Sequence, residues 1–209
     1  MSRIAENGAM IIGSLAMVLL AAYICYIVHA VVVYSMAVKT MGGLSPLQFF
    51  KGMLPAIMFA FSSASSVGTL PINLECVEKL GSDREIASFV LPLGATINMD
   101  GTAIYQGVCA IFIASCYGIN LTLSQMLTVI LTATLASIGT AGVPGAGMVM
   151  LAMVLTSVGL PVDGIALVAG VDRIFDMGRT TVNITGDASC SIIVSNLEKR
   201  REAKLAKKL

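Results

Sequence analysis

The chain alternates long uncharged stretches with a few short polar segments. No charged residue occurs in residues 7–38, 52–74 or 101–162. A helix needs about 20 consecutive apolar residues to cross a bilayer. Residues 9–38 therefore predict one long spanning helix, and residues 101–162 have room for about two or three further passages. The pattern as a whole predicts an all-α membrane protein.

Two polar, glycine-rich breaks interrupt the apolar sequence, at residues 60–71 (AFSSASSVGTLP) and 137–147 (SIGTAGVPGAG). Irregular backbone at membrane depth is tolerated only where protein or a cavity satisfies it. Two such breaks in corresponding halves indicate a transporter built from repeats, with its site at the breaks. The alternative is a pair of ordinary interhelical loops. Ser65 and Ser66 would open a half-helix at the first break; Ser66 as a hydrolase nucleophile lacks a supporting acid.

A polar stripe runs along the last predicted helix. At 100° per residue, about 100° of arc contains Asp172, Asp176, Arg179, Thr180, Asn183 and Asp187. One charge at the bilayer centre costs roughly 2.5–3.5 kcal/mol, so these side chains must face protein, water or ligand. The planar fork of Arg179 suits a carboxylate, and Asp176 could take an amine, which together favour an acidic or zwitterionic amino acid. The alternative is that Asp176 and Arg179 merely pair with each other, a normal i,i+3 arrangement.

A second polar insertion, Asn98-Met99-Asp100-Gly101-Thr102, lies in another apolar helix. Gly94 and Gly101 would let this helix unwind and free its carbonyl groups. Sodium is a hard cation that prefers such oxygen ligands. Further oxygen ligands are supplied by the side chains of Asn98, Asp100, Asn183 and Asp187. Neither the five cysteines nor His29 form an arrangement suited to a transition metal.

Composition and charge exclude several classes of protein. Of the 209 residues 56% are hydrophobic and 12% charged, and the mean hydropathy is +0.89. A soluble domain averages roughly 25% charged residues, so a soluble enzyme is excluded. The net charge of +1 argues against a nucleic-acid binder. The end of the chain, EKRREAKLAKKL, carries six basic and two acidic residues, which predicts a cytoplasmic C-terminus.

Four motifs in order carry a family resemblance: SSVGTLP, LPLGATINMDGTAIYQGV, GTAGVPGAGMVMLAMVL and DMGRTTVNITGD. Together they resemble the sodium-coupled glutamate/aspartate transporters of the dicarboxylate/amino acid:cation symporter family. The resemblance implies a transport-domain core over residues 9–197 with inverted-repeat architecture. Its expected parts are a spanning helix at 9–41, re-entrant helical hairpins at 46–81 and 121–160, a broken helix at 86–118 and a last helix at 162–197. Residues 1–8 would be the end of a preceding helix or a linker, and 198–209 a basic cytoplasmic tail.

The same resemblance implies roles for individual residues, and none of these roles is catalytic. The expected substrate contacts are Ser66, Thr102, Val143, Gly147, Asp176, Arg179, Thr180 and Asn183. One sodium site would use Gly94, Asn98, Asn183 and Asp187, and a second Thr96, Ser137, Ile138 and Thr140. A third would use Asn98 and Asp100 with partners from a helix outside this sequence.

Two features depart from the family pattern. Counterparts of the family's first five helices, which build its homotrimeric scaffold, are missing, so we expect either a fragment or a protein completed by another polypeptide. Many members also carry an additional arginine at a position that is Ala64 or Met177 here. We hypothesise that Arg173 takes over that role.

The sequence therefore predicts sodium-coupled symport of aspartate or glutamate by an elevator-like domain. The expected partners are the amino acid or a dicarboxylate, Na⁺ ions and the lipid bilayer. The expected location is the plasma or inner membrane, crossed several times. Asp176 favours an amino acid, because a plain dicarboxylate has no amine to pair with it. The alternatives are a sodium- or proton-coupled C4-dicarboxylate symporter and a non-transporting truncated fragment.

Overall fold

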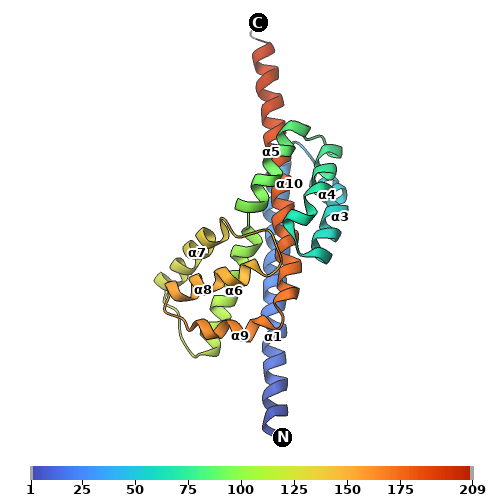
Figure 1. Ribbon diagram of the computed structural model, residues 1–209. Helices are drawn as coiled ribbons and strands as arrows, with labels where there is room; N and C mark the ends of the chain where they lie inside the picture. Colours follow the sequence, from blue (N-terminus) through green and yellow to red (C-terminus); the bar gives the residue numbers. More distant parts are fainter. Residues whose placement is uncertain (1, 208–209) are drawn as a thin grey trace.

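Two long helices form the axis of the molecule. The computed structural model describes residues 2–207, and their side chains from Gly13 onward. Within that range every regular element is a helix, which confirms the all-α prediction. Helix α1 (Ser2–His29) and helix α10 (Asp172–Ala206) run side by side, and the start of α1 and the end of α10 lie at opposite ends (Figure 1).

The first helix changes its winding after His29. After α1 come a π-helical segment η1 (Ala30–Tyr34), a short α2 (Ser35–Ala37) and a second π-helical segment η2 (Val38–Gly42). Such π-segments are rare and frequently lie at functional sites. The helical run Gly13–Gly42 is long and apolar enough to cross a membrane. Its outer face exposes many large apolar side chains.

The first break is the tip of a helical hairpin formed by α3 (Pro46–Ser63) and α4 (Ser66–Lys79). Ala64 adopts a left-handed conformation at φ 53°. The Ser65 hydroxyl then accepts the Gly68 amide at 3.0 Å and caps α4. Because this cap restarts the helix at once, the break is only two residues long, and the Gly-Thr-Leu-Pro part of the motif lies inside α4.

The segment expected as a broken helix at 86–118 contains α5 (Arg84–Ile97) and α6 (Asp100–Cys116). Only Asn98 and Met99 between them lie outside helical structure. Taken together, Arg84–Cys116 is the second segment of the described chain that is long and apolar enough to span a membrane.

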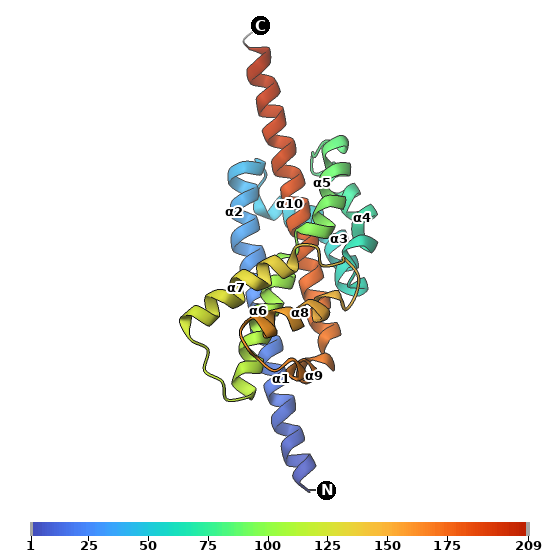
Figure 2. The same ribbon diagram turned by 60° about the vertical axis from the view of Figure 1, so that its left-hand side comes forward.

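The second break joins α7 (Leu123–Ser137) to α8 (Ala146–Ser157). The connection of residues 138–145 is longer than the first tip and includes Gly139 and Gly145 at positive φ. In Figure 1 this second hairpin and the hairpin of α3 and α4 lie on either side of α10, and Figure 2 shows the same helices turned by 60°. Its outer face is apolar, with Leu127, Ile130 and Leu131 each more than half exposed.

The last segment differs from the single helix expected over 162–197. A 3₁₀ turn η3 (Val162–Gly164) and a short α9 (Ile165–Ala169) come first, and α10 begins only at Asp172. Helix α10 also continues into the expected tail as far as Ala206, because the residues after Glu198 are mostly good helix formers. It packs against α1, α3, α4, α5 and α6, so its polar stripe is enclosed by protein.

Candidate functional site

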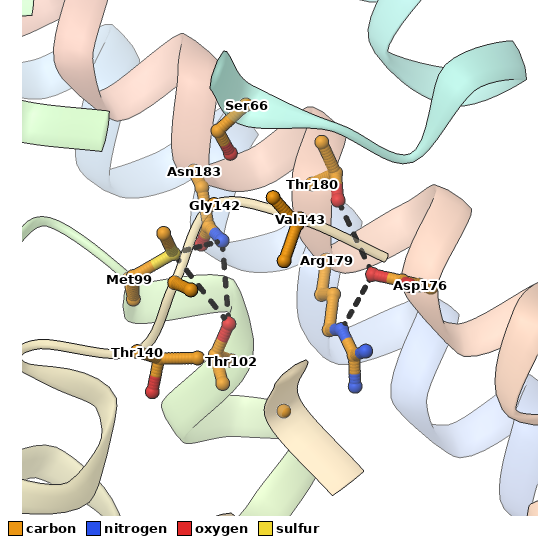
Figure 3. A pocket seen from close by; sticks show the side chains of 12 residues that line it. Ser66, Met99, Thr102, Thr140, Gly142, Val143, Asp176, Arg179, Thr180 and Asn183 are labelled. Carbon is orange, nitrogen blue, oxygen red and sulfur yellow. Dashed lines mark hydrogen bonds and ion pairs between the residues drawn. The ribbon is translucent and has the colours of Figure 1, made fainter. Parts of the chain in front are cut away.

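The two hairpin tips meet beside the N-terminal part of α10, at residues 176–183. The Gly142 carbonyl, between α7 and α8, accepts hydrogen bonds from the Val67 amide and the Ser65 hydroxyl, both at 3.2 Å. The start of α6 and one face of α10 complete a pocket (Figure 3). It is lined by Ser66, Met99, Thr102, Thr140, Ala141, Gly142, Val143, Gly147, Asp176, Arg179, Thr180 and Asn183. All eight residues expected to contact substrate therefore line one pocket, while the contact itself stays a prediction.

Arg179 is the buried cation of this pocket. Its Nε donates to Asp176 Oδ1 at 2.8 Å, and its Nη1 lies 3.4 Å from Asp172 Oδ1. The guanidinium carbon lies 4.6 Å from the centroid of the Tyr105 ring, a cation–π contact. Its Nη2 has no hydrogen-bond partner among the described residues. A buried donor without an acceptor is costly, so this edge of the guanidinium favours a further acceptor.

The pairing of Asp176 with Arg179, considered above as the alternative to ligand binding, is thus present. Asp176 nevertheless has a second partner, because its Oδ2 accepts the Gly145 amide at 2.8 Å. Gly145 immediately precedes α8, where free amides and the helix dipole favour a negative charge. Asp176 therefore links α10 to the second hairpin as well as to Arg179.

Asn183 connects α10 to the start of α6. Its Oδ1 accepts the Gly101 amide at 2.8 Å, and its Nδ2 lies 3.3 Å from Thr102 Oγ1 and 3.0 Å from Met99 Sδ (Figure 3). A Cβ on Gly101 would lie 2.4 Å from the Arg179 carbonyl oxygen. Glycine at this position is therefore what lets α6 begin directly against α10.

The first expected sodium group lies next to this contact. Asn98 Nδ2 donates to Asp187 Oδ1 at 2.9 Å and lies 3.4 Å from the Asn183 carbonyl oxygen. A Cβ on Gly94 would lie 2.4 Å from Asp187 Oδ1. Asp187 is 1% exposed, and its Oδ2 has no hydrogen-bond partner among the described residues. These four residues therefore lie together, with a buried carboxyl oxygen that has no hydrogen-bond partner among the described residues.

The second expected group lies where α7 ends beside the end of α5. The Gly139 amide donates to the Thr96 carbonyl at 3.0 Å, and the Thr140 amide to the Ser137 carbonyl at 3.1 Å. Ser137 and Thr140 are buried, whereas Thr96 and Ile138 are exposed. The hydrogen bond between Gly139 and Thr96 brings this group close to the unwound segment of the first group.

The third expected group is Asn98 and Asp100, and Asp100 contacts two residues that the sequence did not single out for the site. Asp100 Oδ2 lies 2.7 Å from His29 Nε2 and accepts a hydrogen bond from the Tyr34 hydroxyl. Both partners come from the α1–η1 run, 66 to 71 residues away in sequence. The Asn98 side chain points instead toward Asp187.

Sequence reasoning missed other residues of the pocket as well. Met99, Ala141 and Gly142 line it and were not expected there. Their neighbours in the chain were expected, so proximity to the two breaks was the available signal. No comparable signal existed for Tyr34, because it lies in the charge-free run 7–38, away from both breaks.

The hypothesis that Arg173 replaces the family's additional arginine can be compared with the position of its side chain. Arg173 Nη2 lies 3.2 Å from the Ser62 carbonyl oxygen and 3.1 Å from that of Ser63. Its side chain thus contacts the last carbonyl groups of α3, directly before the tip. It is not among the residues lining the pocket.

Comparison with known proteins identifies a single family. Residues 1–197 match the model of the sodium:dicarboxylate symporter family. The chain is 44% identical over 195 residues to excitatory amino acid transporter 1 of Homo sapiens, a match covering 93% of this chain and 36% of that protein. It is 51% identical over 156 residues to an excitatory amino acid transporter of Caenorhabditis elegans, covering 74% of this chain and 31% of the relative. The chain thus spans about a third of the length of the curated relatives it matches.

Proposed function

Because the chain belongs to the sodium:dicarboxylate symporter family, we propose that the complete protein couples sodium movement to transport of aspartate or glutamate. It is a membrane transport protein and not an enzyme. The relatives are named as excitatory amino acid transporters. The observation that carries the choice of substrate is the buried pair of Asp176 and Arg179 in one pocket.

An acidic amino acid offers a carboxylate for Arg179 and an ammonium group for Asp176. The unpartnered Nη2 of Arg179 would donate a hydrogen bond to one carboxylate oxygen, and Nε would donate to the other once it leaves Asp176. Asp176 would then be free to accept the ammonium group. The remaining contacts proposed are Ser66, Thr102, Val143, Gly147, Thr180 and Asn183.

The backbone near the two tips would supply further donors to the substrate. Ser66 opens α4 and Gly145 precedes α8, and the first amides of a helix have no partner within the helix. Such amides favour a bound carboxylate. In this arrangement α3–α4 and α7–α8 act as re-entrant hairpins, and α7–α8 is the extracellular gate.

Sodium is proposed to bind where side-chain and backbone oxygens gather. Asp187 with Gly94, Asn98 and Asn183 forms one site, since the buried Asp187 Oδ2 lacks a donor. The second site is proposed at Thr96, Ser137, Ile138 and Thr140, and the third at Asn98 and Asp100. Asn183 belongs both to the pocket and to the first sodium group, so an ion there would bias the conformation that binds substrate.

We further propose several membrane crossings with the C-terminus in the cytoplasm, and a homotrimer in the complete protein. The basic residues after Glu198 support the cytoplasmic side.

Calorimetric binding of aspartate and succinate to the complete protein, in sodium and in choline, tests the proposal. We expect aspartate to bind only in sodium, and far more tightly than succinate. Asp176→Asn should weaken aspartate binding roughly tenfold to a hundredfold, as for loss of a charged hydrogen bond, and should affect succinate little. The control is Asp163→Asn, since Asp163 is an exposed residue of η3. Equal binding of succinate and aspartate would instead indicate a dicarboxylate carrier.

A further inference from the structure

The carboxylate of Asp100 is surrounded by hydrogen-bond donors from three sources. Its Oδ1 accepts the Gly101 amide at 3.1 Å. Its Oδ2 faces both His29 Nε2, at 2.7 Å, and the Tyr34 hydroxyl. A carboxylate oxygen has two lone pairs, so the two donors at Oδ2 use both of them. A cation at Asp100 would have to compete with these donors for the oxygen.

The Tyr34 hydroxyl has a second acceptor within reach. It lies 3.1 Å from the Val182 carbonyl oxygen of α10. A phenol carries one proton, so it can donate fully to only one of the two oxygens at a time. Tyr34 is 4% exposed, so its hydroxyl has little access to bulk water. The hydroxyl can therefore leave Asp100 without losing its hydrogen bond.

The backbone of Gly186 lies close to the Tyr34 hydroxyl, and Tyr34 itself belongs to η1. Tyr34 is the last residue of the π-helical segment η1, where the helix departs from regular α winding. A Cβ on Gly186 would lie 2.8 Å from the Tyr34 hydroxyl oxygen and 2.6 Å from Asn98 Nδ2. The hydroxyl thus lies near Asn98, the residue shared by two of the proposed sodium sites.

We propose that the Tyr34 hydroxyl is an internal competitor for the cation site at Asp100. It donates to Asp100 Oδ2 when the carboxylate has no cation, and it turns to the Val182 carbonyl when a sodium ion binds. The proton of the hydroxyl is repelled by the ion, and its rotation frees a lone pair of Oδ2. This inference rests on the proposed sodium coupling and adds a residue that tunes it.

The exchange predicts the direction of a mutational effect. A hydrogen bond to a carboxylate is stronger than one to a neutral carbonyl. Tyr34→Phe therefore destabilises the cation-free form more than the cation-bound form. We expect the sodium concentration at the midpoint of binding to fall roughly three- to tenfold. A residue that served as a sodium ligand or merely supported the fold would not produce tighter binding.

The test is thermal unfolding of the complete protein, titrated with sodium chloride at constant ionic strength in choline chloride. Ligand binding to the native state raises the unfolding temperature, so the titration yields the midpoint without measuring transport. The matched control is Tyr23→Phe, because the Tyr23 hydroxyl donates to the Ile174 carbonyl at 2.7 Å and also joins α1 to α10. We expect the Tyr23→Phe midpoint to equal that of the wild type.

A second background separates the two acceptors of Tyr34. An Asp100→Asn protein has no carboxylate for the Tyr34 hydroxyl to bind. The double variant Asp100→Asn, Tyr34→Phe should therefore have the same sodium midpoint as the single variant Asp100→Asn. An unchanged or higher midpoint in Tyr34→Phe would overturn the proposal, as would a full effect in the Asp100→Asn background. A wild-type protein that sodium does not stabilise would overturn the proposed sodium coupling itself, and the competition with it.

Discussion

At the scale of single residues, the site depends on small residues beside large charged ones. A Cβ on Gly147 would lie 2.5 Å from Arg179 Nη1, and a Cβ on Gly94 would lie 2.4 Å from Asp187 Oδ1. In both places a charged group occupies the volume that a side chain would fill. The charged groups can therefore be buried against backbone, where carbonyl and amide groups are available as partners.

Gly94→Ala tests the proposed first sodium site. The added methyl group would push the Asp187 carboxylate away from Asn98, so we expect the thermal stabilisation by sodium to fall by most of its wild-type value. The control is Gly107→Ala on α6, where an added Cβ would meet nothing within 4 Å. That control should be neutral or stabilising by about 0.5–1 kcal/mol, since alanine favours a helix. A Gly94→Ala protein with a wild-type sodium titration would contradict the assignment of Asp187.

At the scale of elements, the first hairpin is held to α10 through its tip. The exposed Arg173 contacts the Ser62 and Ser63 carbonyl oxygens, where the α3 dipole is negative. The Ser65 hydroxyl and Val67 amide bind the Gly142 carbonyl of the other tip. The position of one hairpin therefore constrains the position of the other.

Arg173→Ala should loosen this attachment. Because Arg173 is exposed, we expect the free energy of aspartate binding to weaken by about 0.5–1 kcal/mol. In calorimetry this corresponds to a roughly two- to fivefold weaker aspartate affinity. Arg173→Lys should recover part of the affinity, since an ammonium group can also donate to the carbonyls. The control is Arg84→Ala, which removes an exposed arginine paired with Glu78 at 3.5 Å. Unchanged affinity in Arg173→Ala would end the hypothesis that it replaces the family's additional arginine.

At the scale of the whole molecule, α10 connects the pocket to the far end of the bundle. There the loop between α4 and α5 is attached to α10 by a small polar cluster. Ser195 Oγ donates to Asp83 Oδ2 at 2.9 Å, and Lys199 Nζ lies 3.2 Å from Asp83 Oδ1. The Ser195 hydrogen bond, followed by that from Lys199, lowers the pKa of Asp83 below its ordinary value.

This shift predicts a pH dependence of stability. A carboxyl group whose pKa is lower in the folded state stabilises the fold above its unfolded pKa of about 3.9, and the stabilisation is lost as the pH falls below that value. We expect the wild type to unfold at a higher temperature than Asp83→Asn near neutral pH, with the difference closing below about pH 4. Glu75→Gln, which alters a pair within α4 alone, serves as the control. A difference between wild type and Asp83→Asn that is independent of pH would contradict this prediction.

The sequence by itself determined the helical architecture and the chemical content of the site. Charge-free stretches and the 3.6-residue period are local properties, so the polar stripe of α10 and the broken helix around Asn98 could be predicted. The family resemblance carried by four motifs likewise predicted eight residues that line one pocket. The length of each break was less predictable: the first is two residues long because Ser65 restarts the helix, which depends on a single side-chain hydrogen bond.

Only the tertiary structure decided which polar groups pair with one another. His29 and Tyr34 lie in an apolar helix with no local feature that points to Asp100. They contact Asp100 because α1 packs against α6 and α10, and η1 packs against α10. The contact of Arg179 with the Tyr105 ring and the meeting of Ser65 with Gly142 likewise depend on how helices cross. Hydrogen bonds between distant segments are determined by positions to within an ångström, and spacing along one helix carries no such information.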